Sequence, residues 1–138
     1  MRLFLDANVL FTAAHNPGGR SAAIVQLARA GACTLVTSPH AVEEARRNLR
    51  LKYSSAVDAL EGLLAITSVE AEAPSSGVAW ALERGLPLKD APILAAAAQA
   101  HCDVLVTGDR THFGPLYGRR LRGVEILSPA EALERLLK

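Results

Sequence analysis

The sequence predicts an α/β fold with three layers, α/β/α, around a mainly parallel central sheet of four or five strands. Short apolar runs rich in β-branched residues alternate with helical patterns over the whole length. No repeat, linker or low-complexity tract interrupts this alternation, and 138 residues, half of them hydrophobic, suffice for one domain spanning residues 1–138. Such an alternation places helices on both faces of a parallel sheet.

Composition excludes several classes of protein. A net charge of +1 means that the chain is not a polycation, so a nucleic-acid partner must be held by local clusters or by metal. Cys33 and Cys102 are far apart and form no CxxC motif, which favours buried thiols over a disulfide or a metal site. No secretory signal is visible and no apolar stretch approaches the ~18 residues of a membrane span, so we expect a cytoplasmic protein without a membrane partner.

Residues 2–5 form the first expected strand, and Asp6 follows it directly. An ionised carboxylate at the end of an interior strand costs free energy unless it is hydrogen-bonded or paired with a cation. Asp6 either caps a helical turn through Asn8 and Val9 or retains its charge for a functional reason.

The second unit ends in a helix opened by Ser38 and Pro39, after an amphipathic helix and a strand at residues 21–30 and 34–37. Glu43 and Glu44 on this helix each point about 130° from the centre of its core stripe, on opposite sides. Periodicity alone does not decide which glutamate faces the carboxyl edge of the sheet.

A basic cluster follows on the same helix. It consists of Arg46, Arg47, Arg50 and Lys52. A solvated helix face and a track for nucleic-acid phosphates both explain such a cluster, and the sequence leaves both open.

The third unit begins with a helix over residues 54–64, where Ser55 and Asp58 resemble a capping box. A strand at 65–69, a polar loop at 70–76 and a short helix at 78–84 follow.

The segment from Leu86 to Phe113 contains an interior helix and a buried strand. Nearly every residue from 91 to 100 is Ala, Ile or Leu, so this helix must be covered on more than one side. Asp90 stands where an N-cap belongs, and residues 102–107 predict a strand that Gly108 and Asp109 close. A surface loop, a last strand and a closing helix are expected at residues 110–123, 124–127 and 129–137.

Four acidic positions fall where a parallel sheet binds ligands, beyond the carboxyl ends of its strands. They are Asp6, Glu44 or Glu43, Asp90 and Asp109. Each has a simpler explanation alone, as a helix cap, a solvated helix residue or the polar residue of a turn. Together they would repel one another and raise each other's pKa values unless a divalent cation neutralised them.

Carboxylate ligands without His or Cys suit Mg²⁺ or Mn²⁺ better than zinc. Such a site typically activates a water that attacks a phosphodiester, so the chemistry needs no general-base histidine. His112 alone among the histidines draws attention, because it lies three residues after Asp109, beside the expected site.

Four stretches, LDANVL, SPHAVEEARRNL, LKDAPILAAA and DVLVTGDRTHF, together resemble the PIN-domain nucleases over essentially the whole chain. The resemblance implies a PIN-like α/β/α fold and a metal-dependent ribonuclease. The chain is similar to the single-domain bacterial members of the family, many of which are VapC-type toxins neutralised by a small antitoxin. The resemblance places the family's acidic residues on Asp6, Glu44, Asp90 and Asp109.

The resemblance also chooses between the two glutamates and adds two orienting residues. Glu44 is preferred because the family's glutamate usually comes six residues after the serine matched by Ser38. Asn8 and Thr107 match polar positions that would orient carboxylates or water. Unlike many toxin members, this chain has no further acidic residue in the stretch from Arg110 to Phe113, which puts a second metal ion in doubt and favours a subgroup with a TGDxxHF-like ending.

The leading hypothesis is a Mg²⁺- or Mn²⁺-dependent endoribonuclease in which the four carboxylates hold the metal. We expect this enzyme to act as the toxin of a toxin–antitoxin pair. RNA is the expected substrate, a small antitoxin the expected partner, and a homodimer the expected state. The expected RNA contacts are Lys89, Arg110, Arg46, Arg47 and Arg50. The alternative is a PIN-like RNA- or antitoxin-binding protein with little or no turnover. A phosphatase or phospho-receiver ranks third, because Asn8 stands where DxD phosphatases carry a second aspartate.

Overall fold

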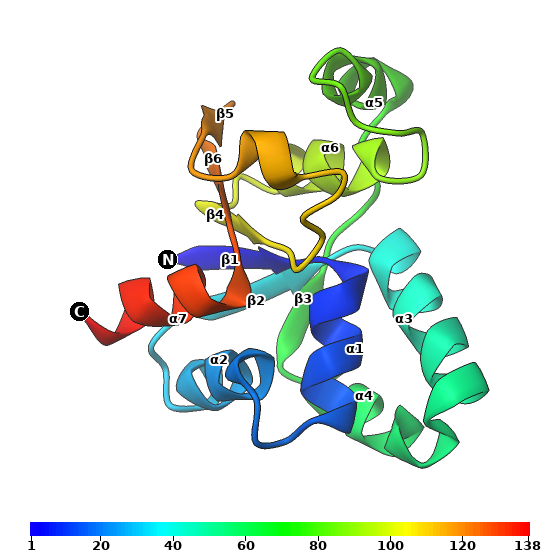
Figure 1. Ribbon diagram of the computed structural model, residues 1–138, viewed down its shortest axis with the longest axis vertical. Helices are drawn as coiled ribbons and strands as arrows, with labels where there is room; N and C mark the ends of the chain where they lie inside the picture. Colours follow the sequence, from blue (N-terminus) through cyan, green and yellow to red (C-terminus); the bar gives the residue numbers. More distant parts are fainter.

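Six strands form one central sheet in the computed structural model, which describes all residues from 1 to 138 (Figure 1). The strands are β1 (Arg2–Leu5), β2 (Thr34–Thr37), β3 (Thr67–Val69), β4 (Val104–Val106), β5 (Arg120–Leu121) and β6 (Val124–Leu127). Their order is β3-β2-β1-β4-β6-β5, and every pairing is parallel except that of β5 with β6. The predicted α/β class and mainly parallel sheet are confirmed.

The sixth strand lies in a segment for which the sequence predicts only a surface loop. β5 and β6 form a hairpin whose two connecting residues, Arg122 and Gly123, both have positive φ, at 48° and 83°. Two such residues make the type I′ turn that matches the twist of paired strands. Arginine is an unusual residue at the first of these positions, so the turn has no clear sequence signature.

Seven α-helices cover the sheet. They are α1 (Ala7–His15), α2 (Arg20–Arg29), α3 (Pro39–Lys52), α4 (Val57–Leu64), α5 (Ser75–Leu82), α6 (Ala91–Gln99) and α7 (Pro129–Leu137), with short 3₁₀ turns η1 (Ser54–Ala56) and η2 (Gly114–Leu116). In Figure 1, α5 and α6 pack together on one side of the sheet, while α1 packs against α2, α3 and α4 on the other. This arrangement gives the predicted three layers.

Two helix starts differ from the sequence predictions. The capping box expected at Ser55 is wrong: a 3₁₀ turn leads into α4, and Ala56 precedes the helix without a side-chain cap. Because the chain is already helical at Ala56, no extended residue is present to act as an N-cap. Helix α5 begins at Ser75, inside the stretch predicted to be a loop.

The core places the ends of β1 and β4 side by side. Phe4 of β1 lies between Val36 of β2 and Leu105 of β4, and all three are buried. Helix α6 is buried on nearly all sides, as its composition predicts. Strands β2 and β4 lie on either side of β1, so the order of the strands reverses at β1. Ligands of open α/β sheets bind beyond the carboxyl ends of the strands at such a reversal. No helix combines the length and apolar character that a membrane crossing requires.

Candidate active site

Asp6 ends β1 and precedes α1, so its side chain lies at the carboxyl edge of the sheet. Its Oδ1 accepts a hydrogen bond from the N–H of Ala7 at 2.7 Å, which caps α1. Its Oδ2 accepts hydrogen bonds from Thr107 Oγ1 at 2.8 Å and Asn8 Nδ2 at 3.1 Å. Only 4% of Asp6 is exposed. Asp6 is therefore a helix cap, as the first explanation requires, and it also belongs to a polar cluster with Asn8 and Thr107, while a functional reason for its charge stays a prediction.

Asn8 and Thr107 connect Asp6 to the loop after β4. The Oδ1 of Asn8 accepts a hydrogen bond from the N–H of Gly108 at 2.7 Å, and Thr107 Oγ1 accepts one from the N–H of Asp109 at 3.1 Å. A Cβ at position 108 would lie only 3.2 Å from Asn8 Oδ1, so glycine permits this close approach. These contacts are the ones that an orienting role for Asn8 and Thr107 requires.

Asp109 is held by the turn that follows it. Its Oδ1 accepts hydrogen bonds from the N–H groups of Thr111 at 2.9 Å and His112 at 3.0 Å. Its Oδ2 lies 3.0 Å from His112 Nδ1, and the same nitrogen lies 2.9 Å from Asp90 Oδ2. The imidazole thus sits between two of the predicted carboxylates.

Asp90 precedes α6 but does not cap it. Its φ and ψ are −99° and −24°, and its side chain makes no capping hydrogen bond. The predicted N-cap interaction is wrong because Asp90 already belongs to a turn, in which its N–H donates to the carbonyl of Pro87 at 3.0 Å. His112 hydrogen-bonds to Asp109, and Asp90 Oδ2 is left buried without a hydrogen-bond partner.

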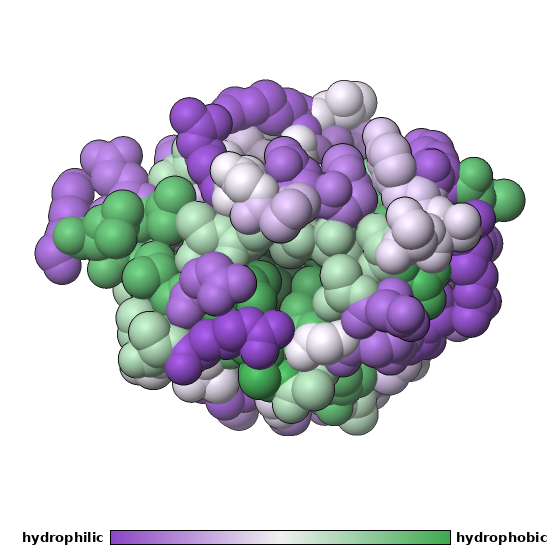
Figure 2. Space-filling view, turned by 90° about the horizontal axis from the view of Figure 1, so that it is seen from below, coloured by the Kyte–Doolittle hydropathy of each residue, from purple (hydrophilic) through white to green (hydrophobic).

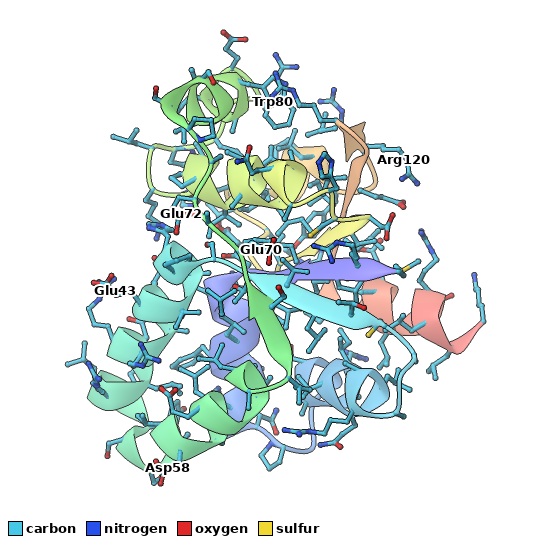
Figure 3. All side chains as sticks on the ribbon, turned by 180° about the vertical axis from the view of Figure 1, so that it is seen from behind. Glu43, Asp58, Glu70, Glu72, Trp80 and Arg120 are labelled. Atoms are coloured by element: carbon cyan, nitrogen blue, oxygen red, sulfur yellow. The ribbon has the colours of Figure 1, made fainter.

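Glu44 faces these aspartates from α3, whereas Glu43 is exposed and points away from the sheet (Figure 3). The four carboxylates line one cleft of about 440 Å³. Its lining consists of Asp6, Asn8, Val9, Thr12, Ser21, Glu44, Lys89, Asp90, Gly108, Asp109 and Pro129. All four acidic residues that the resemblance indicates therefore line one cleft, and of these only Asp90 and Asp109 belong, with His112, to a group whose ligand atoms lie within 4.8 Å of one another.

The pKa values of these carboxyls differ with their surroundings. Burial raises the pKa of Asp6 to about 6, against the hydrogen bonds from Thr107 and Ala7, and the charges of Asp90 and Glu44 add to the rise. Burial also raises the pKa of Asp90, although His112 and Lys89 oppose the shift. Burial favours a higher pKa for Asp109 as well, but the hydrogen bonds from His112 and Thr111 hold it below its usual value. Ionising Asp6 and Asp90 therefore costs free energy in the folded protein.

The residues present fit a hard divalent cation. Asp90 Oδ2 is buried and makes no hydrogen bond of good geometry; the nearest group is His112 Nδ1, 2.9 Å away, which Asp109 shares. One ligand atom each from Asp90, Asp109 and His112 lies within 4.8 Å of the others. Buried polar atoms without partners are rare and call for an explanation such as an ion. A cation among carboxylates would also remove the desolvation cost that raises the pKa of Asp6. His112 is the one member of this group that the all-oxygen set predicted from the sequence lacks, and its Nδ1 lies between the two aspartates.

The predicted RNA contacts are divided between several surfaces. Lys89 lines the acidic cleft, and Arg110 lies in an adjoining pocket. Arg46 binds Glu61 through two nitrogens at 2.9 and 2.7 Å, so its charge is already paired. The remaining two, Arg47 and Arg50, are exposed on α3 and line neither cavity.

Two further residues, one at the acidic cleft and one in the adjoining pocket, have no signature in the sequence. Arg20 and Ser21 begin α2, and Ser21 lines the acidic cleft although its place in an amphipathic helix suggests only packing. The folding of α2 beside the carboxyl edge brings them there, and no motif records that contact.

Known proteins resemble this chain mainly in fold. A family model for the PIN domain matches residues 2–111. A search of curated proteins gives no match. Among solved structures, PAE2754 from Pyrobaculum aerophilum is 21% identical with a TM-score of 0.70, covering 99% of this chain and 96% of that chain.

Two further structures come from toxin–antitoxin systems. VapBC2 from Rickettsia felis, bound to a DNA fragment from its promoter, is 15% identical with a TM-score of 0.67, covering 93% of this chain and 98% of that chain. VapC20 from Mycobacterium tuberculosis, a sarcin–ricin loop cleaving toxin, is 14% identical with a TM-score of 0.58, covering 82% and 94%. Identities this low establish a shared fold, while the family model matches most of the chain directly. This chain belongs to the PIN-domain family.

Proposed function

We propose that this protein is a Mg²⁺- or Mn²⁺-dependent endoribonuclease, with Asp6, Glu44, Asp90 and Asp109 holding the cation. The observation that carries the proposal is the cleft lined by all four carboxylates, in which Asp90 Oδ2 is buried with only the shared His112 Nδ1 beside it. When bound, such a cation stabilises charge on a phosphate oxygen and lowers the pKa of an attacking water. The family membership and the toxins of similar fold support the choice of RNA.

The protein's own groups would orient the reactants. Thr107 and Asn8 fix the carboxylate of Asp6, and the N–H groups of Thr111 and His112 fix that of Asp109. Carboxylates held in this way need little reorganisation when charge develops on the phosphate. Lys89, at the edge of the cleft, would bind a non-bridging phosphate oxygen of the substrate.

Two neighbouring glutamates provide a matched test of the site. Glu44→Gln removes a carboxylate from the cleft, while Glu43→Gln makes the same change on the exposed side of α3. We expect Glu44→Gln and Asp109→Asn to lose RNA cleavage by 100-fold or more, on the order of 3 kcal/mol of transition-state stabilisation. Glu43→Gln should cleave at the wild-type rate. Equal activity in all the variants, with Mg²⁺ or Mn²⁺ present, would refute the proposal.

We further propose a small antitoxin as partner, acting on an apolar face away from the acidic cleft. A cavity of about 470 Å³ between α2 and α7 is lined by Leu27, Leu133 and Leu137. Figure 2 shows apolar residues gathered on the face that includes α2, α1 and α4. The solved relatives VapBC2 and FitAB, which are described as two-component assemblies, support this part of the proposal.

The antitoxin and the homodimer can be tested together. Light scattering should give the mass of two chains for the isolated protein, and a complex of fixed ratio after co-expression with an adjacent small reading frame. Loss of RNA cleavage in that complex would support a toxin. Tight RNA or antitoxin binding by a protein without cleavage under any metal would favour the alternative of a PIN-like binding protein with little turnover.

A further inference from the structure

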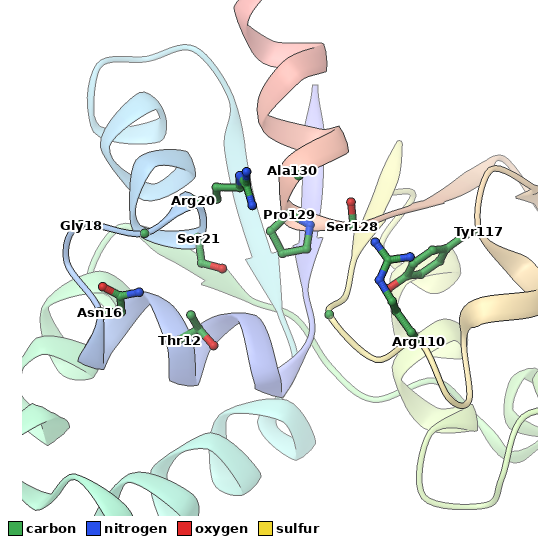
Figure 4. Close-up of a pocket in the computed structure, with 12 residues that line it drawn as sticks. Thr12, Asn16, Gly18, Arg20, Ser21, Arg110, Tyr117, Ser128, Pro129 and Ala130 are labelled. Atoms are coloured by element: carbon green, nitrogen blue, oxygen red, sulfur yellow. The ribbon is translucent and has the colours of Figure 1, made fainter.

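A second cavity, of about 570 Å³, opens beside the acidic cleft (Figure 4). Four residues line both cavities: Thr12, Ser21, Gly108 and Pro129. The two cavities therefore form one continuous groove. Arg20, Arg110 and Tyr117 lie only in the second one, which we call the arginine pocket.

The charge of the arginine pocket is opposite to that of the acidic cleft. Arg20 and Arg110 both line it, and its lining contains no carboxylate. Neither arginine forms a salt bridge within the protein. The guanidinium of Arg110 lies 5.3 Å from the ring centroid of Tyr117, whose hydroxyl donates a hydrogen bond to the carbonyl of Thr107 at 2.7 Å. Tyr117 thus anchors one of the two charges at the pocket.

Helix α2 points its N-terminus into the same pocket. Gly19 precedes the helix and offers no capping side chain. The N–H groups of Arg20, Ser21 and Ala22 have no acceptor within the protein. Exposed amides at the start of a helix favour an anion. A Cβ at Gly19 would lie 2.8 Å from Asn16 Nδ2, so a capping residue there would have to displace Asn16.

Ser21 provides a separate indication of a ligand. It is 3% exposed and lines the pocket, and its hydroxyl makes no hydrogen bond within the protein. In Figure 4 its side chain points into the pocket, between Thr12 and Arg20. The hydroxyl of this largely buried side chain opens onto the pocket, where a ligand oxygen would give it a partner.

We propose that the arginine pocket binds the phosphate of the nucleotide next to the one held at the acidic cleft. Two unpaired guanidiniums, three free amides and a hydroxyl suit a tetrahedral anion with several acceptor oxygens. Continuity with the acidic cleft favours an RNA strand, since its phosphates recur along the groove at regular spacing. The identity of the ligand as RNA rests on the proposed nuclease function, but the anion site itself does not.

Inorganic phosphate tests the anion site without any cleavage. We would titrate phosphate into metal-free ¹⁵N-labelled protein and follow the amide signals by NMR. Signals of residues 20–22 should shift, and the phosphate affinity should fall about 10-fold in Arg20→Gln and about 3-fold or more in Ser21→Ala. Arg29→Gln is the matched control, because it removes the same charge from the exposed far end of α2. An equal loss in this control, or shifts confined to other residues, would overturn the anion site.

A non-cleavable 2′-O-methyl RNA identifies the source of the phosphate. Single methylphosphonate linkages, which are neutral, would be moved along the strand one position at a time. One linkage should weaken binding to the wild type about 10-fold and leave binding to Arg20→Gln unchanged, because that variant has already lost the contact. Competition by a pentaglutamate peptide as strong as that by the RNA would overturn the RNA assignment. If the protein cleaves ordinary RNA but no single methylphosphonate position weakens binding, the arginine pocket does not bind a phosphate of the strand, and the nuclease proposal still holds.

Discussion

Removing the negative charge of Asp6 should stabilise the metal-free protein at neutral pH. Burial raises the pKa of Asp6 from 3.8 to about 6, so the folded protein holds a charge there that the unfolded chain carries more cheaply. That difference corresponds to about 3 kcal/mol. Asp6→Asn retains an acceptor for the N–H of Ala7. Its amide nitrogen would face two donors, Asn8 Nδ2 and the Thr107 hydroxyl, of which the hydroxyl can rotate to accept, so the cost is about 1 kcal/mol. We expect a net gain of roughly 2 kcal/mol at pH 8 in EDTA.

The direction of the pKa shift determines how the stability of the wild type should change with pH. The pKa of Asp6 is higher in the folded than in the unfolded state, so the contribution of Asp6 to wild-type stability is greatest below pH 4. The contribution of Asp6 is lost as the pH rises through about 6. Asp6→Asn should lack that part of the dependence. Urea denaturation at several pH values between 4 and 8 measures the difference, with Asp58→Asn, an exposed carboxylate on α4, as the control (Figure 3). A difference between Asp6→Asn and wild type that does not change with pH would refute the reasoning.

Three further predictions follow from the site and its surroundings. Mg²⁺ or Mn²⁺ at about 100 times its Kd should stabilise the wild type by ~2.7 kcal/mol at pH 8, and the gain measured by thermal unfolding should shrink below pH 6, where Asp6 is protonated. His112→Ala should cost about 1 kcal/mol in EDTA and less in saturating Mn²⁺, because the cation then contacts the Asp90 and Asp109 oxygens that His112 Nδ1 contacts without it; an equal cost in both would contradict this. Ser128→Ala should lower stability by about 1 kcal/mol at neutral pH and at every metal concentration, because Ser128 forms a capping box with Glu131; an unchanged Tm would show that the box contributes nothing.

The sequence predicts the architecture because its strong signals are local. Apolar runs and turn residues identify five of the six strands, and the parallel arrangement then determines that Asp6 and Asp109 share an edge. β5 is missed because its hairpin turn contains Arg122 at a position where Asn or Gly is usual. Asp90 is predicted in the right place for the wrong reason, since its carboxylate faces His112 and does not cap α6.

The rest of the site depends on how loops and helix ends meet in space. Helical periodicity leaves Glu43 and Glu44 equivalent, and only the placement of α3 beside the acidic cleft distinguishes them. His112 reaches Asp90 because the loop after β4 turns back over the start of α6. No sequence motif identifies Ser21, because it reaches the pocket only through the position of α2 in the fold. Membership of a TGDxxHF subgroup stays a prediction.

The most direct test of the metal centre is an anomalous scattering measurement on crystals soaked in Mn²⁺. We predict a peak in the acidic cleft at about 2.2 Å from Asp90 Oδ2, with further ligands from the other three carboxylates. The peak should disappear in Asp90→Asn crystals soaked in the same way. A cleft without a peak at millimolar Mn²⁺, or a peak that survives this substitution unchanged, would contradict the proposed metal centre.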